Sequence, residues 1–287
     1  MTSSFQLRWN YYAAPCKALL KILIKKRRVS IVNMLVDVII ITKNSERMLK
    51  ECLESIYENV PISHLIIVDG HSLDKTLEII GEFQNKHENV LVLKDKGTRA
   101  TARQKGINQV KTDWFMFVDS DAVLCKDWFR KAKKHFGEKV GAVWGIEIWS
   151  TIKNPTLLRM FLWITRKIFD LRGGTHDTLI RTDLVSDIRI PKTLHVFEDA
   201  YIKDWINQKG YKLIPCYDPY CIHHRPKSVW TIRGSLSIIA DSIKAGRLTL
   251  FVKLIVPYGF YTIYSIFQFI SNNIKREGKQ IPTRGLK

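Results

Sequence analysis

Continuous apolar runs alternate with helical patterns over the first half of the chain. The runs are LVDVIIIT (35–42), HLIIVD (64–69), NVLVLKD (89–95) and WFMFVD (114–119), and a helical pattern follows each of the first three. Strands that are apolar at consecutive positions are typical of a parallel sheet that is covered on both faces. The pattern therefore predicts an α/β fold with a mostly parallel central sheet and helices on both faces.

The second half of the chain is less regular. GAVWGIEIW (141–149) predicts a strand, TLLRMFLWITRKIFDL (156–171) an apolar helix, and FEDAYIKDWINQKG (197–210) a short helix that Gly210 ends. Residues 254–271 carry no formal charge but include a proline and a glycine. We interpret this stretch as an interfacial or re-entrant membrane segment, with a single span or a core helix as the alternatives.

The net charge of +19 is carried mainly by the two ends of the chain. Residues 1–34 contain seven Lys and Arg and no acid, and residues 226–287 contain ten against two, which together give +15. Residues 35–225 hold 29 bases and 25 acids, a balance of only +4. We therefore expect a basic N-terminal arm (1–34), a central α/β domain (35–225) and a basic, apolar C-terminal helical region (226–287).

The basic ends favour contact with an anionic surface. Residues 15–28 fit a basic amphipathic helix, which either packs on the body or lies on a membrane. We expect membrane contact through residues 1–30 and 226–275. Five cysteines at scattered spacing, without a C-x-x-C pair, indicate reduced thiols. No signal peptide is evident, so we expect a cytoplasmic, peripherally membrane-associated protein, with a single C-terminal span as the alternative.

Polar side chains follow several of the predicted parallel strands. Thr42 ends the first strand and Asn44 follows it, Asp69 ends the second strand, and Asp119 ends the fourth, with Asp121 two positions on. Because the carboxyl ends of parallel strands lie along one edge, where open α/β sheets bind ligands, we expect these side chains to share a site. Asn44 could equally cap the following helix. A carboxylate at the end of a buried strand, as at Asp69, needs a partner.

The helix after the third strand carries Arg99 and Arg103 in its first turns. Helix N-termini attract anions, so these side chains predict a diphosphate site, with a solvated basic face as the alternative for Lys105. Asp119 and Asp121 are two positions apart and can point the same way from an extended backbone. Their repulsion would be relieved by a hard divalent cation, which binds carboxylates together with substrate phosphates.

Taken in order, these segments resemble the family 2 glycosyltransferases over about residues 35–225. VIIITKN is similar to that family's first strand and turn, IIVDGHSLDKT to its second, FVDSDA to its D-x-D motif, and residues 197–224 to its Glu-Asp element, following strand and late histidine. The resemblance implies a GT-A fold, which is Rossmann-like. It also implies inverting transfer of a sugar from a nucleotide-diphosphate sugar to a hydroxyl or phosphate acceptor, with Mn²⁺ or Mg²⁺.

The resemblance also implies residue roles. Asp199 would be the general base, and Asp119, Asp121 and a histidine, for which we prefer His224 over His223, would hold the metal. The residues implied for the nucleotide-sugar site are Thr42, Asn44, Asp69, Arg99, Arg103, Asp119 and Glu198. Stabilisation of a helix N-terminus is the alternative role for Glu198.

Two other functions compete with this interpretation. A nucleotidyltransferase on a similar core would carry a glycine-rich loop after the first strand, but TKNSER (42–47) has no glycine. A module that only binds an anionic surface would explain the basic ends but not the paired aspartates, so we do not expect a nucleic-acid partner. The apolar segments favour a glycan or lipid-linked acceptor near a membrane.

Overall fold

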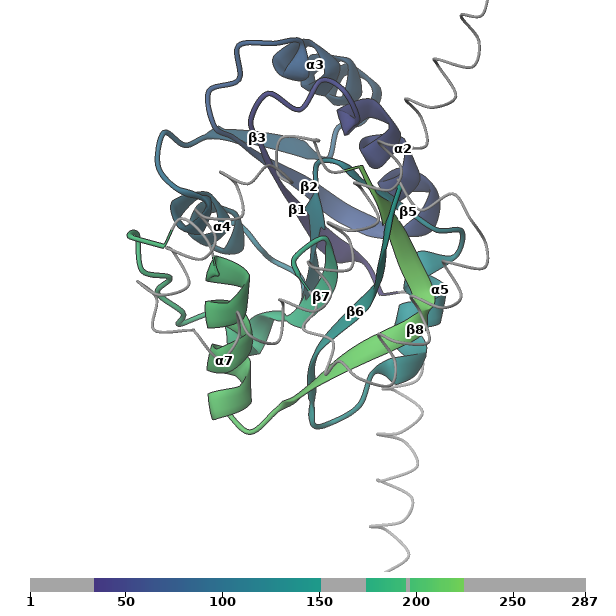
Figure 1. The fold of residues 1–287 in the computed structure, drawn as a ribbon, viewed down its shortest axis with the longest axis vertical. Helices are drawn as coiled ribbons and strands as arrows, with labels where there is room; N and C mark the ends of the chain where they lie inside the picture. The colour runs from purple at the N-terminus through teal and green to yellow at the C-terminus, as the bar shows by residue number, and fades with distance from the viewer. Residues whose placement is uncertain (1–33, 151–173, 195–196, 225–287) are drawn as a thin grey trace, which may run out of the picture.

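The computed structural model describes residues 34–150, 174–194 and 197–224, and these form one α/β unit (Figure 1). Its strands are β1 (Val36–Thr42), β2 (Ile62–Asp69), β3 (Val90–Lys94), β4 (Trp114–Asp119), β5 (Ala122–Leu124), β6 (Val140–Trp149), β7 (Asp177–Arg181) and β8 (Lys212–His223). Its helices are α2 (Leu49–Asn59), α3 (Thr76–Lys86), α4 (Arg99–Ile107), α5 (Trp128–Ala132) and α7 (Glu198–Gln208), with 3-10 turns at Lys133–His135 and Thr182–Leu184.

The first four strands form the parallel half of the sheet. The complete strand order is β3-β2-β1-β4-β7-β6-β8-β5. In the register, Thr42 lies opposite Asp69, Asp69 opposite Lys94, and Ile41 opposite Asp119. The carboxyl ends of these strands therefore meet at one edge, as predicted, and the four predicted strands are confirmed with small shifts at their ends.

The second half of the sheet mixes strand directions. Strand β7 is antiparallel to both β4 and β6, and β5 is antiparallel to β8. The pair β6 and β8 is parallel. Within the described residues four of the seven pairings are therefore parallel, which agrees with a mostly parallel sheet.

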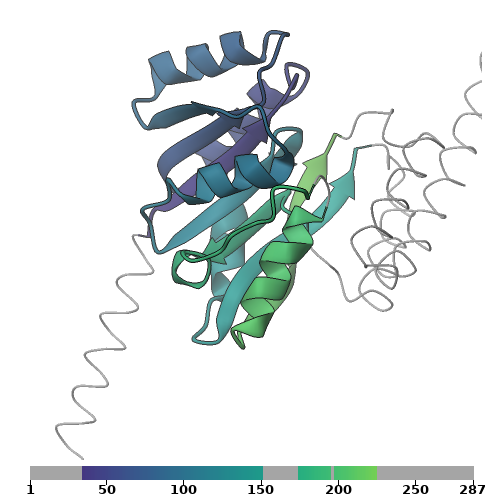
Figure 2. The same cartoon turned by 90° about the vertical axis from the view of Figure 1, so that its left-hand side faces the viewer.

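Helices cover both faces of the sheet, as predicted. Helices α2, α3 and α5 bury side chains such as Leu53, Phe83 and Trp128 against one face. Helices α4 and α7 bury Ile107 and Ile206 against the other face, which is turned toward the viewer in Figure 2. Gly210 has a left-handed φ of 77° just beyond α7, which confirms the predicted end of that helix.

Asp37 lies at the amino ends of the parallel strands, opposite the edge where their carboxyl ends meet, and it is fully buried in β1. Its carboxylate accepts hydrogen bonds from the amides of Lys111 at 2.6 Å, Thr112 at 3.1 Å and His64 at 3.1 Å, and from the ring of His64 at 2.9 Å. Burial opposes ionisation of Asp37, but these donors outweigh it and hold its pKa below the usual value. Asp37 thus links the start of β1 to β2 and to the loop before β4.

Several predicted segments lie outside the described residues. These are nearly all of the arm 1–34, the apolar helix 156–171, and the region 226–287 with its uncharged stretch 254–271. Among the described residues, none of the helices combines the length and apolar character that crossing a membrane requires.

Candidate active site

Asp119 and Asp121 lie at the carboxyl edge of the sheet with about a quarter of each side chain exposed, at 27% and 25%. Strand β5 begins directly after them and pairs with β8, so that Ala122 lies opposite His223. This pairing brings the ring nitrogen Nε2 of His223 to 2.8 Å from Asp121 Oδ1 and 4.0 Å from Asp119 Oδ2. Two acidic side chains and an imidazole therefore converge at the site predicted from the D-x-D pattern.

The histidine in this group is His223, whereas the sequence interpretation preferred His224. Adjacent residues of a strand point to opposite faces, so only one of the two can face Asp121. His224 contributes its backbone instead: its amide donates to Asp121 O at 2.8 Å, and its carbonyl accepts from the guanidinium of Arg47. Burial, together with the positive charge of Arg47, lowers the pKa of His224. The geometry thus transfers the proposed ligand role from His224 to His223.

Glu147 is a site residue that the sequence analysis did not identify. Its Oε1 lies 2.7 Å from Nδ1 of His223, on the side of the ring away from Asp121. It comes from β6, which runs parallel to β8 and places Glu147 opposite Cys221. The available signal was a single carboxylate inside the apolar strand GIEIW, where a charge needs a partner.

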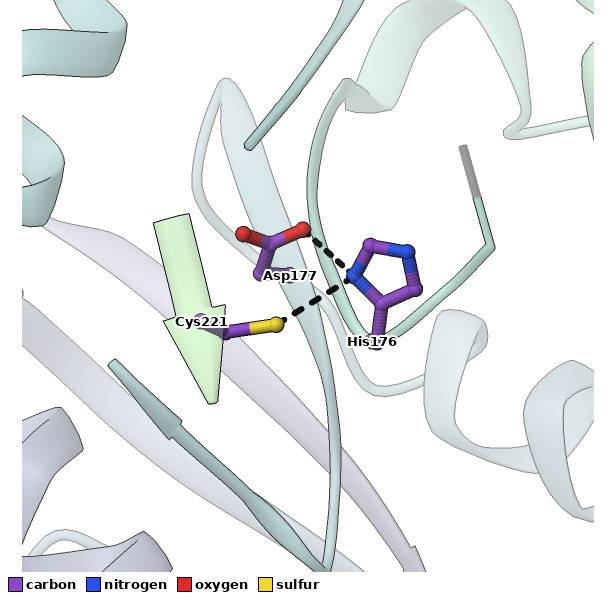
Figure 3. A group of neighbouring side chains, drawn as sticks. All are labelled: His176, Asp177 and Cys221. Carbon is purple, nitrogen blue, oxygen red and sulfur yellow. Dashed lines mark hydrogen bonds and ion pairs between the residues drawn. The ribbon is translucent and has the colours of Figure 1, made fainter. Parts of the chain in front are cut away.

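His176, Asp177 and Cys221 form a buried polar cluster (Figure 3). This cluster lies next to Glu147, whose Oε2 is 3.8 Å from Nε2 of His176. Nδ1 of His176 is 2.7 Å from Asp177 Oδ1 and 3.5 Å from Cys221 Sγ, and Trp128 Nε1 donates to Asp177 Oδ2 at 2.9 Å. A nucleophilic Cys–His–Asp triad requires the thiol and the carboxylate on opposite ring nitrogens, but here both face the same one. The cluster therefore does not have the geometry of a catalytic triad that would activate the Cys221 thiol.

Among the residues that the structure describes, two groups of side chains are candidates for a cation, and they differ in access. The donor atoms of His176, Asp177 and Cys221 lie within 4.8 Å of one another, but all three residues are buried. Asp119 and Asp121 are partly exposed, and hard divalent cations prefer such carboxylate oxygens and leave positions open for phosphate. The chemistry and exposure of Asp119, Asp121 and His223 therefore fit a cation that is shared with a diphosphate, and those of the buried cluster do not.

Arg103 joins the D-x-D motif to helix α7. Its Nε donates to Glu198 Oε1 at 3.1 Å and its Nη2 to Asp119 Oδ1 at 3.3 Å. The side chains of Arg103 and Glu198 are only 4% and 6% exposed. Burial alone would lower the pKa of Arg103, but the charges of Glu198 and Asp119 raise it above its usual value. Arg103 therefore remains cationic between two carboxylates, and its Nη1 has no hydrogen-bond partner among the described residues.

The predicted pair Arg99 and Arg103 is divided by the fold. Arg99 is exposed at the first position of α4, where Thr98 caps the helix by accepting from the amide of Thr101 at 3.3 Å. Lys105 donates to the carbonyl of Lys94 at 2.6 Å and is not part of the same group. Of these two arginines, Arg99 is open to solvent at the helix N-terminus, whereas Arg103 belongs to the buried ion-pair network.

Thr42, Asn44 and Asp69 hold the first two strand ends together. Asp69 is fully buried, and its Oδ1 accepts from the hydroxyls of Thr42 at 3.0 Å and Ser72 at 2.5 Å. Asn44 is exposed with a left-handed φ of 51°, and its Oδ1 accepts from the amide of Leu73 at 2.9 Å. The structure shows a role for these side chains in shaping the edge, and their contact with a nucleotide stays a prediction.

Glu198 and Asp199 open helix α7 but differ in surroundings. Phe197 precedes them with a left-handed φ of 66°, which turns the chain sharply into the helix. Glu198 is buried and accepts a hydrogen bond from Arg103, so its role is not limited to stabilising the N-terminus of α7. Asp199 is partly exposed, and its charge contributes to the raised pKa of Arg103. Asp199 is therefore the acid of this pair that solvent can reach.

Comparison with known proteins places this arrangement among sugar-transferring enzymes. The model of the Glycosyl transferase family 2 matches residues 37–179. The poly(ribitol-phosphate) beta-glucosyltransferase of Bacillus spizizenii is 30% identical over 112 residues, which are 36% of this chain and 18% of that protein. The dolichyl N-acetyl-alpha-D-glucosaminyl phosphate 3-beta-D-2,3-diacetamido-2,3-dideoxy-beta-D-glucuronosyltransferase of Methanococcus voltae is 32% identical over 101 residues, which are 33% of this chain and 32% of that protein. The matches thus span a third or less of these two relatives.

A solved structure extends the likeness beyond these segments. The mannosyltransferase PcManGT from Pyrobaculum calidifontis, in complex with GDP-Man and Mn²⁺, has a TM-score of 0.60 and 21% sequence identity with this chain. The superposition covers 75% of this chain and 64% of that one. At this identity the likeness establishes the fold, and it confirms the predicted architecture.

Proposed function

The chain belongs to glycosyl transferase family 2 and has the GT-A fold, and from this premise we propose that it transfers a sugar from a nucleotide-diphosphate sugar to a hydroxyl or phosphate acceptor. The observation that carries the proposal is the convergence of Asp119, Asp121 and His223 at the carboxyl edge of the parallel strands. Ligands of open α/β sheets bind at this edge.

The donor site consists of the D-x-D carboxylates and the strand ends beside them. Asp119 and Asp121 together with His223 would hold Mn²⁺ or Mg²⁺, which offsets the negative charge that develops on the departing diphosphate. Exposed Arg99 at the N-terminus of α4 adds a positive charge that suits the diphosphate. Asn44, exposed at the end of the first strand, is available to the nucleoside. The complex of PcManGT with GDP-Man and Mn²⁺ supports this kind of donor and cation.

Asp199 is the proposed general base. An acceptor hydroxyl gives its proton to Asp199 while its oxygen bonds to the anomeric carbon, and the carbon–oxygen bond to the diphosphate breaks with its electron pair remaining on the diphosphate. Attack from the face opposite the leaving group inverts the anomeric centre. Asp199 suits this role because it is partly exposed and its neighbour Glu198 is occupied by Arg103. Its place in the first turn of α7 favours the ionised carboxylate.

The first experiment identifies the donor and tests the cation. The purified chain is screened by thermal shift against nucleotide sugars with and without Mn²⁺, and release of nucleoside diphosphate is then followed with the stabilising donor. We expect cation-dependent release that falls to background in Asp121→Asn and is unchanged in Asp187→Asn, whose side chain is 62% exposed and pairs with Lys209. If no sugar nucleotide stabilises the protein, the donor assignment fails, and release of pyrophosphate would indicate a nucleotidyltransferase.

The second experiment tests the base and the stereochemistry. Asp199→Asn keeps the size of the side chain but cannot accept the acceptor proton, so kcat should fall by roughly 10²–10⁴-fold with little change in donor binding. Nuclear magnetic resonance of the product gives its anomeric configuration. A product that retains the configuration of the donor would reject both inversion and the role of Asp199.

We also propose a glycan or lipid-linked acceptor at a membrane surface. The support is the +15 carried by residues 1–34 and 226–287 and the naming of the Methanococcus voltae relative for a dolichyl-linked sugar phosphate. Flotation with vesicles that contain anionic lipid should recover the full chain, and deletion of residues 1–30 should reduce that recovery while transfer to a soluble acceptor survives. Equal recovery with neutral and anionic vesicles would contradict electrostatic attachment.

A further inference from the structure

The imidazole of His223 lies between two carboxylates. Its Nε2 is 2.8 Å from Asp121 Oδ1, and its Nδ1 is 2.7 Å from Glu147 Oε1. The side chain is only 5% exposed, so solvent does not replace either contact readily. Both neighbours are fixed by the sheet, since β8 pairs with β5 on one side and with β6 on the other.

The chemistry of the ring assigns a different task to each nitrogen. An ionised carboxylate only accepts hydrogen bonds, so Nδ1 must carry the proton that faces Glu147. The same reasoning applies to Nε2 and Asp121 while no cation is bound, so a cation beside Asp121 must displace the proton between these two atoms before it bonds to the lone pair of Nε2. Metal-binding histidines commonly donate their second ring N–H to a carboxylate, which fixes both the tautomer and the ring orientation. Glu147 is on the far side of the ring from Asp121, so it cannot bind the same cation while it keeps this contact.

Glu147 also contacts a second histidine, His176. Its Oε2 lies 3.8 Å from Nε2 of His176, whose ring is 5% exposed beside Asp177. The preceding residue, Ile146, is 7% exposed, so the carboxylate emerges from an apolar stretch of β6. A carboxylate in such surroundings is costly unless it is paired, and the contact with His223 Nδ1 provides that pairing.

We propose that Glu147 is a positioning residue that orients His223 so that Nε2 faces the cation held by Asp121. This inference rests on the proposed function, because it assigns His223 a role in cation binding. Loss of the Nδ1 acceptor frees the ring to rotate and favours the tautomer that keeps its proton on Nε2, toward Asp121, and that proton blocks the cation. Glu147 therefore acts on cation affinity through His223 without touching the substrate.

The test measures Mn²⁺ binding directly, by titration monitored through the electron paramagnetic resonance of free Mn²⁺ without any donor. Glu147→Leu should weaken Mn²⁺ binding by roughly 10–100-fold, and Glu147→Gln, whose amide oxygen can still accept from Nδ1, should weaken it less. Glu54→Leu, at an exposed glutamate of α2, is the matched control and should bind as the unaltered chain does. On a His223→Ala background, Glu147→Leu should cause no further loss.

Two outcomes overturn the inference: equal Mn²⁺ affinity in Glu147→Leu and the unaltered chain, or a loss that persists in full on the His223→Ala background. A cation-free measurement separates failure here from failure of the proposed function. The ¹⁵N shifts of the His223 ring, assigned by their absence in His223→Ala, should show a protonated Nδ1 that is lost in Glu147→Leu. Unchanged shifts in that variant, or in Glu147→Ala if the first variant does not fold, refute the positioning role even if the chain binds no Mn²⁺.

Discussion

Removal of the Arg103 guanidinium should destabilise the protein strongly. In Arg103→Met the methionine fills most of the same space, but Glu198 loses the partner that lies 3.1 Å from its carboxylate. The Arg103 and Glu198 side chains are 4% and 6% exposed, so water cannot replace the lost charge. At an effective dielectric constant of about 20, unit charges about 4 Å apart attract by about 4 kcal/mol. Breaking a buried pair from one side costs about 3–5 kcal/mol, and we expect that loss in the free energy of unfolding.

The pair between Arg130 and Asp127 is the matched control. Its closest contact is 2.7 Å, shorter than that of Arg103 with Glu198, but its side chains are 66% and 39% exposed. Exposed ion pairs contribute little because water and salt screen both charges. Arg130→Met should therefore leave the unfolding midpoint nearly unchanged, and the contrast isolates burial from distance.

Urea denaturation of the single variants and of the double variant Arg103→Met/Glu198→Leu provides the assay. The double variant should recover most of the stability, because no unpaired charge stays buried and Asp119 is 27% exposed and can be solvated. The midpoints should shift without a change in the slope of free energy against urea. The reasoning is refuted if Arg103→Met is no more destabilising than Arg130→Met, or if the double variant is no more stable than Arg103→Met.

Two further predictions concern stability away from the ion-pair network. Because the pKa of Asp37 is lowered in the folded protein, its charge stabilises the fold above the ordinary aspartate pKa of about 3.9, and this contribution is lost as the pH falls through the lowered value. Asp37→Asn should therefore lower the melting temperature at neutral pH and flatten its acid dependence, and parallel pH curves would contradict this. In Gly145→Ala the new Cβ would lie 2.3 Å from Asp177 Oδ2 and 2.8 Å from the carbonyl of Pro219, so we expect a loss of about 1–3 kcal/mol by denaturation. Gly81→Ala, in helix α3 with no atom within 4 Å of the new Cβ, should stabilise by up to about 1 kcal/mol, and equal effects of the two changes would reject the steric argument.

The parallel half of the fold could be predicted because its signals are local. Each strand from β1 to β4 is apolar at most positions, and the helices between them repeat the pattern of buried residues at helical spacing. Strand β7 escaped prediction because Asp177 and Thr178 are polar yet fully buried, so its hydropathy resembles that of a loop. Helix α5 is only five residues long, which is too short for a periodic signal.

The candidate site likewise contains residues that local sequence patterns predict and residues that only the folded sheet brings in. Asp119 and Asp121 follow directly from the end of a predicted strand, so their position was visible in the sequence. The choice between His223 and His224 was not, because alternation on a strand puts the two on opposite faces without indicating which of them shares a face with Asp121. Glu147 reaches the site only through the pairing of β6 with β8, whose partners lie more than seventy residues apart in the chain.

The two halves of the site come from parts of the chain with different degrees of family likeness. The family match ends at residue 179, so it includes Asp119, Asp121 and Glu147 but not Asp199 or His223. These last two are brought to the edge by α7 and β8, and Arg103 links the first half to α7 through Glu198. A change in this link should therefore alter the base and the cation site together. Arg103→Met/Glu198→Leu, which we expect to be stable, should then lose transfer activity even though it keeps every proposed cation ligand and Asp199, and full activity in that variant would show that the two halves work independently.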